Sequence, residues 1–279
     1  MPSVFITGAS TGIGRDAALR MSRRGWVTFG GVRTDADAES LISASDGLIT
    51  PVRCDVTDVE EIAAAADQVL SVTGGSLTGL VNNAGIARPG PLEILPIEDL
   101  RVQLDVNVVG QLAVTQAFVD VLRNEGGRIV NIGSVSGMYG APGIGAYAMS
   151  KFALEAFTDV LRRELAPWKI SVSIIQPGSI ETPIWDKTIA AARPLLESLD
   201  EGQRARYEPL IKPLAHGAAA PTRTPVSAVS DAVEHALVDR RPRTRYAVGP
   251  SARWITILRR LLPDRGLDRL ARIRRSRET

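Results

Sequence analysis

The chain has 279 residues, of which 44% are hydrophobic and 23% charged, and its formal net charge is +2. These values are typical of a globular protein with one large domain or two small ones, and the small net charge gives no overall attraction to nucleic acid. One cysteine and two histidines exclude an internal disulfide and leave no plausible ligand set for zinc, so no metal site is expected.

Strand-like and helix-like segments alternate along most of the chain. The expected strands are short, β-branched and without polar alternation, which is typical of strands covered on both faces. They comprise residues 4–6, 27–32, 48–53, 79–81, 128–132, 171–175 and 246–248. The expected helices comprise residues 12–24, 36–44, 59–72, 97–123, 147–166 and 226–238. This alternation predicts an α/β fold with a single Rossmann-type, doubly wound parallel sheet and helices on both faces.

The alternation stops in the segment from about 178 to 225. Its length and its scattered apolar residues, Trp185 among them, predict a substrate lid with some helix of its own; ordinary core packing of these residues is the alternative. We divide the chain into a catalytic domain, residues 1–250, and a basic C-terminal extension, residues 251–279. The extension has nine arginines against three acidic residues, so its net charge is about +6.

In the extension, Trp254, Ile257, Leu258 and Leu261 fall on one face of an expected helix. A basic amphipathic helix can lie on an anionic membrane, but covering the domain or forming an oligomer contact is favoured. Without a recognised nucleic-acid module, the arginines predict no nucleic-acid binding. No apolar run reaches the ~18 residues of a membrane span, and a strand begins at once with no leader before it. With the single Cys54, this predicts a cytoplasmic protein.

A glycine-rich turn, Thr7-Gly-Ala-Ser-Thr-Gly-Ile-Gly14, follows the first expected strand. Gly8, Gly12 and Gly14 lack the Cβ atoms that would keep a pyrophosphate away from the backbone. The helix that follows points its N-terminal amides at the phosphates. A glycine trio alone is weak evidence, but its position between a strand and a helix indicates dinucleotide binding. Three more residues of the turn are expected cofactor contacts: Ser10, Thr11 and Ile13.

The end of the second expected strand favours NADP over NAD. An acidic residue there would bind the ribose 2′-hydroxyl and repel a 2′-phosphate, but the chain has Val32 and then Arg33. A guanidinium suits a phosphate, and Arg15 is expected near the same pocket. Asp35 or Asp37 could instead fold back to read a 2′-hydroxyl, which would favour NAD.

Asp55 and Val56 follow the third expected strand and therefore reach the same edge of the sheet. The Asp55 carboxylate is placed to accept a hydrogen bond from the adenine amine. The alternative is structural, because Asp55 and Thr57 are both suited to capping the N-terminus of the next helix.

Tyr147 and Lys151 lie one turn apart on one face of an expected helix. A tyrosine with its usual pKa of ~10 is a poor acid–base at neutral pH, but a nearby ammonium lowers the pKa of a phenol. Lys151 is also placed to hold the cofactor's ribose. Ser134, at the end of the fifth strand, is placed to donate to a carbonyl oxygen, with Ser136 as a local rival. Tyr-x-x-x-Lys alone is a common surface pattern, so the interpretation rests on the order of all these motifs.

In this order the motifs resemble the short-chain dehydrogenase/reductase family, over about residues 3–250. The turn from Thr7 to Gly14 is similar to the family's cofactor turn. Asn82-Asn-Ala-Gly85 is similar to its fourth-strand motif, which implies that Asn83, Ala84 and Gly85 line the cofactor. The resemblance also implies that a loop with Pro177, Gly178 and Thr182 meets the nicotinamide carboxamide.

The resemblance further implies roles for the catalytic residues. Tyr147 and Lys151 match the family's acid–base and its helper, and Ser134 matches the serine that orients the carbonyl. Asn107 matches the residue whose helix distortion holds a water in a proton relay to the lysine. A polar residue in a β-branched helical run is consistent with such a distortion, and a buried residue satisfied by its own backbone is the alternative.

Expected substrate contacts are Ser134, Met138, Tyr139, Tyr147 and Trp185. The apolar lid favours a bulky hydrophobic carbonyl or alcohol, and the Gly-Gly-Val-Arg33 strand end looks similar to hydroxysteroid- and retinol-dehydrogenase-like members. The sequence thus predicts an NADP-preferring carbonyl/alcohol oxidoreductase (a ketoreductase) with NAD as the other cofactor. By analogy with the family it is a homodimer or homotetramer. A non-catalytic NADP(H)-sensing protein on the same fold is the alternative.

Overall fold

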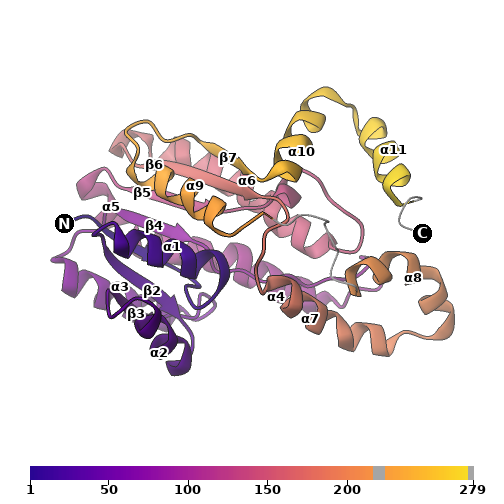
Figure 1. Ribbon diagram of the computed structural model, residues 1–279, viewed down its shortest axis with the longest axis horizontal. Coiled ribbons are helices and arrows are strands. Elements are labelled where there is room, and N and C mark those ends of the chain that lie inside the picture. The colour runs from indigo at the N-terminus through magenta and orange to yellow at the C-terminus, as the bar shows by residue number, and fades with distance from the viewer. Residues whose placement is uncertain (216–223, 276–279) are drawn as a thin grey trace.

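A seven-stranded parallel sheet forms the centre of the computed structural model, which describes residues 1–215 and 224–275 (Figure 1). The strand order is β3-β2-β1-β4-β5-β6-β7. The strands are β1 (Ser3–Ile6), β2 (Val27–Val32), β3 (Ile49–Arg53), β4 (Gly79–Asn82), β5 (Arg128–Ile132), β6 (Ser171–Pro177) and β7 (Arg245–Val248). The order reverses between β1 and β4, which is where open α/β sheets bind ligands beyond the carboxyl ends of their strands. The predicted Rossmann-type fold is confirmed.

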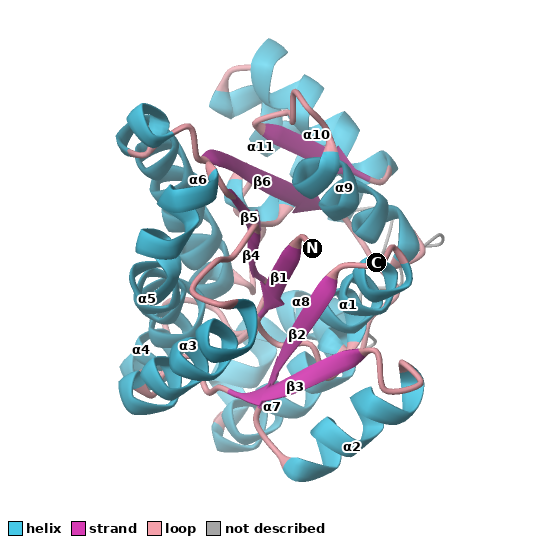
Figure 2. Cartoon of the chain, turned by 90° about the vertical axis from the view of Figure 1, so that its left-hand side faces the viewer, coloured by secondary structure: helices cyan, strands magenta, loops and turns pink. Residues whose placement is uncertain are grey.

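Helices cover both faces of the sheet (Figure 2). One face carries α1 (Gly12–Arg23), α2 (Asp35–Ala44) and α9 (Ser227–Val238). The other carries α3 (Val59–Thr73), α4 (Ile97–Leu104), α5 (Gly110–Glu125) and α6 (Gly145–Glu164). A hydrophobic core lies between the sheet and the helices on each face. The same strands contribute side chains to both cores, because successive side chains of a strand point to opposite faces.

Strand β1 shows how one segment supplies two cores. Val4 and Ile6 are fully buried in the cluster with α1 and α9. Phe5, between them, is fully buried in the cluster with α3 and α5, where its ring centroid lies 4.9 Å from that of Phe118. Each fully buried side chain of this size contributes about 1.5–3 kcal/mol, so the sheet centre that carries the glycine turn is firmly held.

The helix expected over residues 97–123 is interrupted. α4 ends at Leu104, a π-helical turn, η1, covers Asp105–Val109, and α5 begins at Gly110. A Cβ at Gly110 would lie 2.5 Å from the Val56 carbonyl oxygen, so glycine lets this helix approach the β3–α3 connection closely. The distortion predicted around Asn107 is therefore present, as an inserted residue in the helix.

The segment after β6 is mostly helical where it is described. It contains α7 (Ile184–Ser198) and α8 (Glu201–Ala215), while residues 216–223 of the expected lid lie outside the described residues. The sequence predicts only some helix here. Pro194, inside α7, is the kind of residue that weakens a helical pattern.

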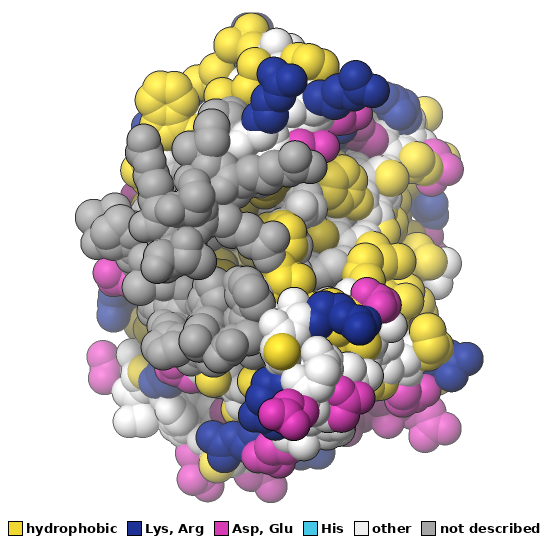
Figure 3. Space-filling model, turned by 90° about the vertical axis from the view of Figure 1, so that its right-hand side faces the viewer, with side chains coloured by type: hydrophobic (Ala, Val, Ile, Leu, Met, Phe, Trp, Pro, Cys, Tyr) yellow, Lys and Arg dark blue, Asp and Glu magenta, His cyan; other side chains and the backbone are white. Residues whose placement is uncertain are grey.

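The C-terminal extension forms α10 (Pro250–Leu261) and α11 (Asp264–Arg275). α10 packs on β7, and its Ala252 is fully buried. On its outer side Trp254, Ile257 and Leu261 are exposed, and Figure 3 shows hydrophobic and basic side chains together at the top of this view. The division at residue 250 stays a prediction, and residues 276–279 lie outside the described part. Within the described chain, no helix is both long enough and apolar enough to cross a membrane.

Candidate active site

A cleft of about 1560 Å³ opens beyond the carboxyl ends of the central strands. Its walls come from the glycine turn, the ends of β2 to β6, the start of α6, the lid helix α7 and the start of α10. Most residues predicted to bind cofactor or substrate line it: Gly8, Ser10, Thr11, Gly12, Ile13, Arg33, Asp55, Val56, Asn83, Ala84, Gly85, Ser134, Tyr139, Tyr147, Lys151, Pro177, Gly178, Thr182 and Trp185. The cleft is large enough for a dinucleotide together with a second molecule.

The glycine turn has the conformation that a dinucleotide needs. Gly8 and Gly12 have φ of +64° and +57°, which L side chains rarely adopt. Gly14 does not line the cleft. A Cβ there would collide with the Gly8 carbonyl and the Asn83 side chain, so Gly14 permits close helix packing, and its predicted cofactor contact stays a prediction.

A clamp holds the turn to the end of β4. The Thr7 hydroxyl oxygen accepts from the backbone amides of Asn83 and Ala84, each at 3.0 Å. The Asn83 side-chain amide donates to the carbonyls of Thr7 (2.9 Å) and Gly8 (3.0 Å). Thr7 was missing from the predicted site residues. Its signal is its position, directly before the first glycine of the turn.

A network of hydrogen bonds between buried polar side chains joins the strands to the helices near the cleft. The side chain of Asn82 donates to Thr115 and to Asn131, each at 2.9 Å, and Asn131 donates to Thr158 at 2.8 Å. These bonds join β4 and β5 to α5 and α6. Because Ser134 follows β5 and Tyr147 opens α6, the network fixes the two elements that carry them.

Arg33 lies at the β2 end of the cleft, as the NADP prediction requires. Arg15 lies beside the glycine turn, because its guanidinium donates to the Ser10 carbonyl at 3.4 Å and to the Ser40 hydroxyl and carbonyl, each at 3.1 Å; it does not line the cleft itself. Asp35 and Asp37 are in the first turn of α2 and do not line the cleft. At the β2 end of the cleft, where a 2′-phosphate would bind, the structure thus has the guanidinium of Arg33 and no carboxylate from α2.

Asp55 faces the cleft, and its carboxylate accepts from the Thr57 amide (2.9 Å) and hydroxyl (2.7 Å). Burial acts to raise the pKa of Asp55, but these hydrogen bonds and the nearby Arg33 and Arg53 outweigh it and lower the pKa. The capping alternative is wrong: Asp58 caps α3 by accepting from the amides of Glu60 (2.9 Å) and Glu61 (3.1 Å).

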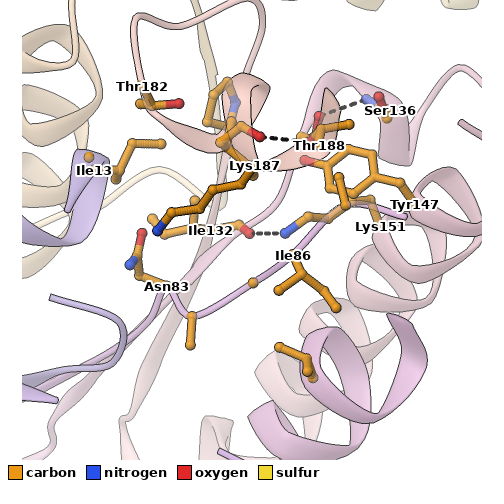
Figure 4. Close-up of a pocket in the computed structure, with 18 of the residues that line it drawn as sticks. Ile13, Asn83, Ile86, Ile132, Ser136, Tyr147, Lys151, Thr182, Lys187 and Thr188 are labelled. Carbon is orange, nitrogen blue, oxygen red and sulfur yellow. Dashed lines mark hydrogen bonds between the residues drawn. The ribbon is translucent and has the colours of Figure 1, made fainter. Parts of the chain in front are cut away.

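Lys151 is 4% exposed, and its Nζ donates to the Ile132 carbonyl oxygen at 2.7 Å (Figure 4). The same Nζ lies 5.6 Å from the centroid of the Tyr147 ring. Burial lowers the pKa of Lys151 to about 8. The ammonium is therefore still the main form at neutral pH, although this pKa lies only about one unit above 7.

The pKa of Tyr147 is raised, so the predicted lowering is wrong. The sequence argument has Lys151 lowering the pKa of the phenol. In the structure burial raises the pKa of Tyr147, and only the neighbouring Ser134 hydroxyl acts in the opposite direction. The reason is desolvation, which disfavours the charged phenolate. A phenol with a pKa above its usual ~10 keeps its proton at neutral pH.

Ser134 stands at the end of β5, and its Oγ accepts from the Ser136 amide at 3.1 Å. Both serines are buried and line the cleft. Ser134 is the one close enough to Tyr147 to affect its pKa, which favours it over Ser136 as the partner of the phenol.

Asn107 does not line the cleft but is joined to it. Its Oδ1 accepts from the Ile86 amide (2.9 Å), and its Nδ2 donates to the Ile86 carbonyl (3.0 Å) and to Ser150 Oγ (3.1 Å). Ser150 in turn donates to the Tyr147 carbonyl at 2.7 Å. The π-helical turn is thus tied to the helix that carries Tyr147. Ser150 was missing from the sequence prediction, because nothing local shows which residue Asn107 meets.

Met138, a predicted substrate contact, lies outside the main cleft and lines a smaller pocket of about 350 Å³ between β7 and α10. Its sulfur accepts from Gln176 Nε2 at 3.5 Å. The segment expected to form a lid contributes more than predicted. Besides Trp185, whose indole donates to the Ile180 carbonyl at 3.3 Å, Lys187 lines the cleft. Among the described residues, no group of histidine, cysteine and acidic side chains is arranged to hold a metal.

Comparison with known proteins agrees with this geometry. Residues 2–192 match the short chain dehydrogenase family. The 3-amino-tetrahydro-pyrrolizinone reductase of Xenorhabdus hominickii is 43% identical over 208 residues, 74% of this chain and 71% of that protein. Retinol dehydrogenase 5 of Mus musculus is 36% identical, with 95% of this chain and 86% of that protein covered. A crystal structure of a short chain dehydrogenase from Burkholderia cenocepacia in complex with NADP superposes with a TM-score of 0.74, at 28% identity and with 95% and 94% of the chains covered. The chain therefore belongs to the short-chain dehydrogenase family of NAD(P)-dependent oxidoreductases.

Proposed function

We propose that the protein transfers a hydride between NADP(H) and the carbonyl or alcohol carbon of a hydrophobic substrate. The observation that carries this proposal is the convergence of Ser134, Tyr147 and Lys151 in one cleft with the glycine turn. A bound nicotinamide supplies or accepts the hydride. The residues of this chain supply binding, orientation and protons.

Tyr147 is the proposed general acid and base. In reduction its phenol gives a proton to the carbonyl oxygen as the carbon is reduced, and in oxidation the same oxygen takes the proton back. The protonated state favoured by burial suits the reductive direction. Ser134 donates to the carbonyl oxygen and stabilises the negative charge that develops there.

Lys151 and Asn107 support this proton transfer. Lys151 is placed to hold the cofactor's ribose, and its ammonium, 5.6 Å from the centroid of the Tyr147 ring, supplies a positive charge in this part of the cleft. Asn107 acts through Ser150 and the start of α6, so it is a positioning residue.

NADP is the proposed preferred cofactor. Arg33 at the β2 end of the cleft is suited to a 2′-phosphate, and no acidic side chain of α2 lines the cleft to oppose it. The structural neighbour from Burkholderia cenocepacia, which holds NADP, agrees with this choice. NAD remains the alternative.

The substrate is proposed to be bulky and apolar. Beyond Tyr147, the wall of the cleft is rich in large hydrophobic side chains: Ile86, Val102, Ile144, Ile184, Trp185, Leu210 and Ile255. Such a lining binds an apolar body and leaves the polar contacts to the reacting oxygen. The similarity to a retinol dehydrogenase, an enzyme named for a hydrophobic alcohol, supports this class.

A homodimer is the proposed assembly. Large hydrophobic side chains are exposed on neighbouring parts of η1, α5 and α6: Val109, Leu112, Met149, Phe152 and Val160. Such a patch on a folded chain is typical of a protein–protein interface, and a second copy is the simplest partner.

The test is the oxidation of NADPH, and separately of NADH, by purified protein over a panel of apolar ketones and aldehydes. We expect turnover of several members of the panel, with a higher kcat/KM for NADPH than for NADH. Tight NADPH binding without turnover across the panel would contradict the proposal and favour the non-catalytic sensor.

A further inference from the structure

Lys187 is a cation in the cleft to which the proposed reaction gives no role. It belongs to the first turn of α7, where its amide donates to the Pro183 carbonyl at 3.2 Å. Figure 4 shows its side chain extended through the cleft toward Asn83, between Thr182 and Ile132. Asn83 is the residue that clamps the glycine turn.

The lid and the glycine turn are close neighbours at this point. A Cβ placed on Gly12 would lie 3.4 Å from the Cβ and Cγ2 of Thr182, and 3.8 Å from Pro183. The first turn of α7 therefore faces the N-terminus of α1 across a narrow gap. A helix N-terminus attracts anions, so this gap is where a diphosphate would be held.

Three other cations that line the cleft are held in other places. The ammonium of Lys151 is bound to the Ile132 carbonyl. The Nε of Arg88 lies 3.7 Å from Oδ1 of Asp99, with which it forms an ion pair. Arg33 lies at the β2 end of the cleft, near the Asp55 carboxylate. Lys187, in contrast, reaches from the lid toward the glycine turn.

We propose that Lys187 binds the diphosphate bridge of the dinucleotide and so ties the lid to the bound cofactor. This inference rests on the proposed function, since it needs a dinucleotide in the cleft. It adds a residue of the lid to the cofactor site, and it makes lid order depend on the cofactor. Because Lys187 is an exposed residue, the contact is expected to weaken as salt screens it.

The test measures the Kd of NADPH and of NADH with Lys187→Gln, Lys187→Arg and, as a control outside the cleft, Lys169→Gln. Energy transfer from tryptophan to the reduced nicotinamide reports binding, and Trp185 lines the same cleft. We expect Lys187→Gln to weaken both nucleotides about 5- to 20-fold at low salt, in line with one charge-assisted hydrogen bond. The loss should shrink at high salt, Lys187→Arg should restore most of the affinity, and Lys169→Gln should match the wild type.

A second readout follows the lid itself. Trypsin cleavage after Arg204 and Arg206, both in α8, is measured with saturating NADPH and without it. We expect NADPH to protect these sites in the wild type and to protect them less in Lys187→Gln at equal saturation. A lid that NADPH leaves equally exposed in both proteins would contradict the coupling.

The outcomes separate this inference from the proposed function. If the wild type binds neither nucleotide, the proposed function fails. If the wild type binds both and Lys187→Gln binds them equally well, only the role of Lys187 fails. A loss confined to NADPH would place Lys187 at the 2′-phosphate, and a change confined to the KM of the carbonyl substrate would place it at the substrate; either result would overturn the assignment.

Discussion

Burial has opposite effects on the two titrating side chains of the site. Removal from water disfavours the charged form, so it raises the pKa of Tyr147 and lowers that of Lys151 to about 8. At neutral pH the phenol keeps its proton, and the lysine stays mostly charged. Both states suit the proposed reduction of a carbonyl, in which Tyr147 gives up its proton.

The Lys151 pKa leads to a stability prediction. The unfolded lysine has a pKa of ~10.4 and the folded one about 8, so between these values the unfolded chain binds more protons. The free energy of unfolding should therefore rise with pH over this window, by on the order of 3 kcal/mol. Urea unfolding at pH 7.5 to 10 should show this rise in the wild type relative to Lys151→Met. Equal pH dependence of the two proteins would contradict it.

Arg33 provides a prediction about cofactor choice. Arg33→Ala removes the cation at the β2 end of the cleft, so NADPH should bind at least about tenfold more weakly. NADH carries no 2′-phosphate and should bind as before. The Kd values for both nucleotides check this, with Arg53→Ala, an exposed arginine outside the cleft, as the control. Equal losses for NADPH and NADH would show that Arg33 does not read the 2′-phosphate.

At the scale of elements, the side chain of Asn107 ties the π-helical turn η1 to Ile86 and to Ser150. Asn107→Leu loses the hydrogen bonds to Ile86 and Ser150 and leaves buried backbone groups unpaired, each at a cost of about 1–3 kcal/mol. We expect a loss of at least about 2 kcal/mol in urea unfolding, and a lower kcat because η1 is no longer bonded to Ser150, which contacts the Tyr147 carbonyl. Asn107→Asp keeps the acceptor for the Ile86 amide and should lose less. A stable, fully active Asn107→Leu would contradict this role.

The elements also show what a sequence can reveal. The glycine turn and the Tyr147–Lys151 pair are local patterns, and a parallel sheet brings the ends of its strands together, so both could be predicted. The direction of the Tyr147 pKa could not, because it depends on burial by distant segments. Met138 and Lys187 depend on how side chains turn within the fold, and the bond from Asn107 to Ser150 spans 43 residues of sequence.

In the whole molecule, the cleft lies between the sheet and two helical segments from the C-terminal part of the chain. Helices α7 and α8, the proposed lid, lie on one side, and α10 and α11 on the other (Figure 1). Ser251 accepts from the Ser179 amide at 3.3 Å, and Ile255 lines the cleft. The start of the basic extension is thus in contact with the loop proposed to meet the nicotinamide.

Assembly is the prediction at this scale. If η1, α5 and α6 form the interface, the double variant Leu112→Glu, Phe152→Glu should place four charges in it and separate the copies. Light scattering after gel filtration should give twice the chain mass of 29.9 kDa for the wild type and a single mass for the variant. Val72→Glu, an exposed position on α3, is the control. A monomeric wild type would contradict the dimer.

The central claim is that Tyr147 provides the proton for carbonyl reduction. The most direct measurement compares Tyr147→Phe with the wild type, using NADPH binding and the rate of carbonyl reduction on the same samples. We predict that NADPH affinity changes less than about threefold while kcat falls by about 10²- to 10⁴-fold, because only the proton donor is lost. A variant that binds NADPH normally and reduces the substrate at close to the wild-type rate would contradict the account.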